Sequence, residues 1–182
     1  MIALGDRQAK ETKATAVEPG RVPVDLAAYQ RRIRSGACFV CGIVRGDPGY
    51  QHEQVVFEDA NHIAFLDGYP TLYGKVLVAP KPHIEHVVGE LSRQAFLELL
   101  AVVHRVAAAV ERVVPSERTY LLSLGSQQAN AHVHWHIAPL PAGTPLERQQ
   151  FHALMLEHGT IPWPVERAAE LATRLREALA RQ

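Results

Sequence analysis

The sequence AHVHWHI, residues 131–137, alternates histidines with apolar residues. Successive side chains of a β-strand point to opposite faces, so His132, His134 and His136 are expected on one face, about 6.6 Å apart per step. The apolar residues between them then face the core. Three imidazoles on one face of a strand suit a metal site, a proton relay, or a nucleophile with helper groups.

Short apolar runs on the N-terminal side of this stretch predict four more strands. They cover residues 55–57, 63–66, 74–79 and 119–124, and the histidine strand covers 131–138. The first two flank Asp59-Ala60-Asn61, a turn sequence, and therefore predict a hairpin.

Helical spacing of apolar residues predicts a long helix over 91–114, with Ser92 as its N-cap and Pro115 as its stop. A short helix is expected over 24–34. A last amphipathic helix is expected over 165–180, with inward residues Ala168, Leu171, Ala172, Leu175 and Leu179. Short antiparallel connections and one long helix together predict an α+β fold, a sheet with a helix on one face.

The composition is that of an ordinary globular protein. The 182 residues contain 19 basic and 19 acidic side chains, so the formal net charge is zero. This balance argues against a general binder of nucleic acid or of a membrane surface. The charged N-terminus has no apolar run of signal-peptide length, and no stretch has the length of a spanning helix. A cytoplasmic location is therefore expected.

The only two cysteines, Cys38 and Cys41, are three positions apart, a spacing that indicates metal or redox chemistry. One zinc ion cannot easily take all three strand histidines, because His132 and His136 start about 13 Å apart on a flat strand. We therefore expect one strand histidine to bind the metal and the others to take part in the chemistry. The expected ligands of a structural zinc ion are Cys38, Cys41, His83 and His132.

These residues resemble the histidine triad (HIT) family, whose signature is His-φ-His-φ-His-φ-φ with φ hydrophobic. Residues 132–138 fit this signature, and the resemblance includes Cys38 to Ile43, Phe65-Leu66-Asp67 and Leu77 to His83. It implies a HIT-like fold with about five antiparallel strands, a long helix, and helical extensions at both ends. We therefore divide the chain into an N-terminal arm, 1–35, partly flexible, a HIT domain, 36–141, and a C-terminal helical extension, 142–182.

The resemblance also implies a mechanism. In the family the middle histidine attacks the α-phosphorus of a nucleotide, which assigns His134 as the nucleophile that forms a nucleotidyl-histidine. His136 would stabilise charge or assist proton transfer, and Asp67 would hold the ribose hydroxyls. Cys-x-x-Cys with the upstream and first triad histidines binds zinc in related bacterial members, which matches the four expected ligands.

Other residues are assigned around the phosphates. Gln127, Gln128 and Asn130, just before the triad, are expected to donate hydrogen bonds to phosphate oxygens. Lys75 stands where many members have a histidine, and it brings a cation that changes phosphate contacts, although a solvated strand residue is the simpler interpretation. His86, three residues past His83, is either a neighbour of the metal site or a substrate-side group, and is not assigned to the site.

The resemblance implies a HIT-type nucleotidyl hydrolase or transferase, acting on dinucleoside polyphosphates or nucleoside phosphoramidates. One alternative is a nucleotide-binding regulatory protein with little turnover. Another is a metal-centred hydrolase that uses several triad histidines as ligands. Family members commonly form homodimers through the long helix and a sheet edge, and the C-terminal extension is expected to pack on the domain or on the dimer partner.

Overall fold

The computed structural model describes residues 20–50 and 54–182. Its centre is a five-stranded antiparallel sheet with strand order β1-β2-β3-β5-β4. The strands are β1 (Val55–Glu58), β2 (His62–Leu66), β3 (Val76–Pro80), β4 (Arg118–Ser123) and β5 (Trp135–Leu140). The expected sheet and its hairpin are confirmed.

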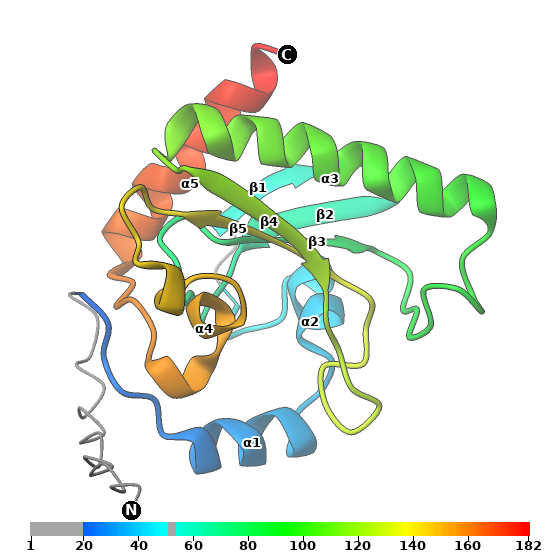
Figure 1. The fold of residues 1–182 in the computed structure, drawn as a ribbon. Helices are drawn as coiled ribbons and strands as arrows, with labels where there is room; N and C mark the ends of the chain where they lie inside the picture. Colours follow the sequence, from blue (N-terminus) through cyan, green and yellow to red (C-terminus); the bar gives the residue numbers. More distant parts are fainter. Residues whose placement is uncertain (1–19, 51–53) are drawn as a thin grey trace, which may run out of the picture.

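Helices cover both faces of this sheet (Figure 1). They are α1 (Leu26–Ser35), α2 (Phe39–Arg45), α3 (Arg93–Val113), α4 (Phe151–Leu154) and α5 (Val165–Ala180), with single 3-10 turns at Leu146–Arg148 and Leu156–His158. The helices α3 and α5 lie on one face, and α1, α2 and α4 lie beyond the other (Figure 1). The long helix and the helical segments near both ends were expected from the sequence.

The main core lies between the sheet and the pair α3 and α5. Leu99 and Val103 of α3 and Ile137 of β5 are almost fully buried in it. Ser92 caps α3 as expected, because its side chain accepts a hydrogen bond from the Ala95 amide. The five inward residues expected for α5 are all buried. Both helices therefore hold one face of the sheet rigid behind the histidines.

The histidine strand is shorter than expected, since β5 begins at Trp135 and not at residue 131. The prediction that His132 and His134 lie within this strand is therefore wrong. Residue 133 turns away from the sheet ladder, because the Val133 amide donates to the Ile84 carbonyl at 2.6 Å in the loop after β3. The alternation of faces nevertheless persists, since Val133 is buried in the core under α3 and His134 contacts Phe39 of α2.

The N-terminal part of the chain runs beside the C-terminal part. Val22 and Thr160 form an antiparallel bridge, and the guanidinium of Arg21 donates to the Ala153 carbonyl at 3.2 Å. The arm expected at 1–35 lies partly outside the described residues, which begin at 20. The division into 1–35, 36–141 and 142–182 stays a prediction. Within the described ranges, none of the helices has both the length and the apolar character needed to cross a membrane.

Candidate functional site

The four expected metal ligands come together from three separate parts of the chain. Cys38 caps the start of α2, Cys41 lies in its first turn, His83 follows β3, and His132 precedes β5. The ligand atoms all lie within 4.8 Å of one another. The sulfur of Cys38 is 3.3 Å from Nδ1 of His132, and that of Cys41 is 3.3 Å from Nδ1 of His83. These side chains are positioned to bind a metal ion.

Hydrogen bonds orient both histidines of this cluster toward the thiols. The Nε2–H of His132 donates to the Pro80 carbonyl at 2.8 Å, and that of His83 donates to Oε1 of Glu85 at 3.0 Å. A carbonyl or carboxylate can only accept, so Nδ1 keeps the lone pair in each ring. This arrangement of a ligand imidazole held by an acceptor is typical of metal sites. Two sulfurs and two nitrogens match a tetrahedral ion.

The surroundings of Cys41 keep its thiol protonated. Burial, together with the neighbouring thiol of Cys38, raises the pKa of Cys41 to about 11. A metal ion reverses this effect, because thiolates are its ligands and its charge favours their ionised form. A metal ion held by these four side chains would therefore displace protons from the thiols.

His134, the middle histidine, is held in one tautomer. Its Nδ1 lies 2.7 Å from the backbone carbonyl of His132, which can only accept, so Nδ1 carries the proton and Nε2 keeps the lone pair. Burial lowers the pKa of His134, so the ring is neutral near pH 7. The ring also packs edge-on against Phe39, with centroids 5.5 Å apart. A fixed, neutral imidazole with one free nitrogen is poised for nucleophilic attack.

His136 lies beside the middle histidine, with ring centroids 4.8 Å apart. Burial, followed by the nearby cation of Lys75, lowers the pKa of His136 to about 3. Its Nδ1 is buried and has no hydrogen-bond partner within the described part of the chain. His136 is thus neutral at pH 7, which limits it to hydrogen bonding until a substrate brings negative charge near it.

We expect the stability to fall as the pH drops from about 6.5 toward about 3, the pKa of folded His136. In this window the unfolded chain protonates His136 and the folded protein does not, so acid favours unfolding. Urea unfolding at a series of pH values measures the slope. His136→Gln is expected to flatten it by up to about 1.4 kcal/mol per pH unit. Equal slopes in both proteins would contradict this assignment.

Asp67 and Lys75 form a buried ion pair, with Nζ of Lys75 3.0 Å from Oδ2 of Asp67. Lys75 is 6% exposed, so its interpretation as a solvated strand residue is wrong. The Asp67 amide donates to the Lys75 carbonyl at 3.0 Å, which places both residues beyond the paired ends of β2 and β3. Burial opposes ionisation of Asp67, but Lys75 and the Tyr69 amide outweigh it and hold the pKa of Asp67 below its usual range.

Removing one partner of this ion pair is expected to lower the free energy of unfolding. Lys75→Met leaves the buried carboxylate of Asp67 without its counter-ion, which costs about 3–5 kcal/mol of the free energy of unfolding. The double variant Asp67→Asn/Lys75→Met leaves no uncompensated charge and is expected to lose less than Lys75→Met alone. Urea unfolding of both single variants and the double variant closes the cycle. A double variant that loses the sum of the single losses would show that the two side chains are not coupled.

The three side-chain amides expected at the phosphates lie in different surroundings in the structure. Gln127 lines a cavity beside His134, and Gln128 does not. Asn130 has a left-handed backbone conformation, with φ of 54°, and its side-chain amide donates to the Tyr29 hydroxyl of α1 at 3.2 Å. The roles of these amides at a phosphate stay predictions. The contact with Tyr29 was missed, because nothing in the sequence pattern links α1 to the triad.

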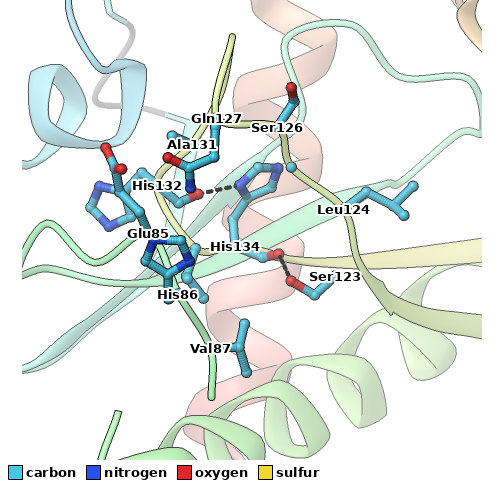
Figure 2. Close-up of a pocket in the computed structure, with 12 residues that line it drawn as sticks. Glu85, His86, Val87, Ser123, Leu124, Ser126, Gln127, Ala131, His132 and His134 are labelled. Carbon is cyan, nitrogen blue, oxygen red and sulfur yellow. Dashed lines mark hydrogen bonds between the residues drawn. The ribbon is translucent and has the colours of Figure 1, made fainter. Parts of the chain in front are cut away.

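The cavity beside His134 has a volume of about 280 Å³. Two loops form it, the one between β3 and α3 and the one between β4 and β5. Figure 2 shows His134 between His86 of the first loop and Ser126 of the second. Ser123, also in the lining, donates its hydroxyl to the His134 carbonyl at 2.9 Å and so holds the backbone behind the ring. His86, which the sequence left unassigned, therefore lies at the site.

The sheet with its histidine triad and the Cys/His cluster define a class of protein, the histidine triad proteins. The family model described as HIT domain matches residues 49–142, and the chain belongs to this family.

Similar proteins from other organisms support the same family. The adenosine 5'-monophosphoramidase of Schizosaccharomyces pombe is 36% identical over 108 residues, 58% of this chain and 75% of the yeast protein. A hypothetical histidine triad nucleotide-binding protein of Sulfolobus tokodaii aligns with a TM-score of 0.62 and 28% identity, over 79% of this chain and 93% of that one. A zinc-bound histidine triad family protein of Mycobacterium smegmatis has a TM-score of 0.62 and 26% identity, over 80% of this chain and 94% of that one. The HIT-like fold expected from the sequence is confirmed.

Proposed function

We propose that this protein is a nucleotide hydrolase or transferase that attacks the α-phosphate through Nε2 of His134. The observation that carries the proposal is the tautomer of His134, which is fixed by the 2.7 Å contact between Nδ1 and the His132 carbonyl. The neutral ring needs no separate base before attack, because its free nitrogen already holds a lone pair.

The reaction has two displacements at phosphorus. In the first, the lone pair of Nε2 forms a bond to the α-phosphorus, and the bond to the leaving group breaks with its electrons. In the second, water attacks the same phosphorus and gives up a proton to solvent, and the bond to Nε2 breaks with its electrons, which restores the neutral imidazole of His134. For a phosphoramidate, the leaving nitrogen takes up a proton from solvent in the first displacement. The His132 carbonyl stabilises the positive charge that the ring carries between the two steps, and His136 donates a hydrogen bond to the phosphate.

Around this centre, Asp67 is proposed to accept hydrogen bonds from the ribose hydroxyls. The ion pair with Lys75 supports this role, because it keeps Asp67 ionised and therefore an acceptor. Lys75, paired with Asp67 beside the triad, is proposed to supply positive charge to the phosphate-binding region. Gln127 is proposed as a phosphate contact from the lining of the cavity.

We propose zinc as the metal held by the Cys/His cluster. Two sulfur and two imidazole donors favour zinc over calcium or magnesium, and the similar protein of Mycobacterium smegmatis is zinc-bound. The ion would complete a closed four-ligand site, so its contribution is to stabilise the fold. It takes no part in either displacement.

Dinucleoside polyphosphates and nucleoside phosphoramidates are the proposed substrates. The fission yeast relative, a named phosphoramidase at 36% identity, favours phosphoramidates. Turnover of both classes by the purified protein, followed by chromatography of the released mononucleotide, tests the proposal. Tight mononucleotide binding by calorimetry without turnover of any substrate would instead establish a nucleotide-binding regulatory protein.

A homodimer is also proposed, with a cytoplasmic location. β4 is at the edge of the sheet, where its outer backbone groups face no other strand of the sheet. Leu121 of this strand is 46% exposed and Leu97 of α3 is 49% exposed, so both elements expected at the interface carry apolar surface. Sedimentation equilibrium tests this assembly, and a mass of one chain at all concentrations would exclude it.

A further inference from the structure

His86 is held at the cavity by a tight turn in the loop between β3 and α3. The amides of Glu85 and His86 both donate to Oε2 of Glu90 at 2.7 Å. Two hydrogen bonds to one carboxylate oxygen fix the backbone of His86 relative to the start of α3. The side chain of His86 lines the same cavity as His134 (Figure 2). A second imidazole is thus placed beside the nucleophile by an ordered loop.

The ring of His86 differs from those of His83, His132 and His134. Those of His83, His132 and His134 each hydrogen-bond a fixed acceptor. The ring of His86 makes no hydrogen bond to any residue in the described ranges, and His86 is exposed. Its nitrogens are therefore available to a ligand in the cavity.

The lining of the cavity also includes Ser126, which carries a hydroxyl, and Gln127, which carries an amide. The one carboxylate in the lining, Glu85, already accepts from Nε2 of His83 at 3.0 Å. These side-chain donors suit an anion with several oxygen atoms better than ammonia or a small amine, whose nitrogen accepts only one hydrogen bond. The volume of about 280 Å³ is below the 300–1,000 Å³ typical of sites for whole drug-sized ligands. The cavity thus fits part of a substrate.

The position of the cavity indicates which part of a substrate it binds. The α-phosphorus must come within about 3–3.5 Å of Nε2 of His134 before attack. The groups bonded to this phosphorus then lie in or next to the cavity. Resting on the function proposed above, we propose that His86 binds the phosphate groups of a polyphosphate leaving group and so favours polyphosphate over phosphoramidate substrates. His86 is therefore a specificity-determining residue.

The test compares two substrates that share a nucleotide but differ in leaving group, diadenosine tetraphosphate and adenosine 5'-monophosphoramidate. His86→Ala is expected to lower kcat/KM for the tetraphosphate about ten- to a hundredfold, the loss of one hydrogen bond to a charged group. Its kcat/KM for the phosphoramidate is expected to stay within about twofold of wild type. His86→Gln, which keeps one donor, is expected to recover part of the loss. His104→Ala, at an exposed histidine of α3 outside the cavity, is the matched control.

Each outcome has one meaning. Equal losses on both substrates would overturn the inference, because His86 would then support the metal-binding loop or the nucleophile. Wild-type rates on both substrates would overturn it too, because the cavity would then not bind the leaving group. In either case the proposed function stands. A wild-type protein without turnover of either substrate would overturn the proposed function and this inference together.

Discussion

His134→Ala is expected to lower the turnover of nucleotide substrates on the order of 10⁴- to 10⁶-fold, the range found when a catalytic nucleophile is removed. Nδ1 of His134 carries the ring proton, because it donates to the His132 carbonyl. Nε2 therefore carries the lone pair that attacks the phosphorus, and the variant removes it. Steady-state release of mononucleotide measures the loss.

The variant needs two controls. His104→Ala removes an exposed histidine of α3 and is expected to keep wild-type turnover. Thermal unfolding of His134→Ala shows whether the fold survives the loss of the contact with Phe39. A folded His134→Ala protein that retains more than about one hundredth of the activity would contradict the nucleophilic role.

Cys41→Ser is expected to cause a large loss of stability. Its thiol contacts both His83 and His132, at 3.3 and 3.6 Å, so the variant removes the ligand that joins the two histidines. A metal at about 1,000 times its Kd stabilises the fold by about 4 kcal/mol. Its loss is therefore expected to lower Tm by about 10 °C. Calorimetric melting, together with the metal content of the purified protein, measures both quantities.

Removing the metal with a chelator distinguishes a structural role of the metal from a catalytic one. Chelation is expected to lower the Tm of wild type and to leave that of Cys41→Ser almost unchanged, since the variant has lost the site. The single-turnover rate of chelated wild type, below its new Tm, is expected to stay within about threefold. A rate that vanishes with the metal and returns on adding it would establish the metal-centred hydrolase instead.

Most of the fold could be predicted from periodicity. The helical spacing along α3 and α5 matches their buried faces, because both helices pack one apolar stripe on the sheet. The hairpin of β1 and β2 follows from a turn sequence between apolar runs. The cluster of Cys38, Cys41 and His83 with His132 was predictable because metal sites limit the choice of ligands.

The remaining features depend on contacts between distant segments. The late start of β5 follows from the bond between Val133 and Ile84, which a strand pattern does not reveal. Lys75 is buried because Asp67 lies at the end of the neighbouring strand, a pairing that depends on register. The contact between Asn130 and Tyr29 joins residues 101 positions apart. A sequence read in local windows contains none of these pairings.

Trapping of the covalent intermediate distinguishes His134 from every other candidate nucleophile. The protein is mixed with a dinucleoside polyphosphate, quenched in mild base, and analysed by intact-mass and then peptide mass spectrometry. We expect the mass of one nucleotidyl group on the peptide that carries residues 131–137, fragmenting to His134, and no adduct on His134→Ala. His136→Gln is expected to hydrolyse the nucleotidyl adduct more slowly than wild type and so to accumulate more of it. An adduct on another residue would contradict nucleophilic catalysis by His134. Turnover without an adduct in both wild type and His136→Gln would contradict it too.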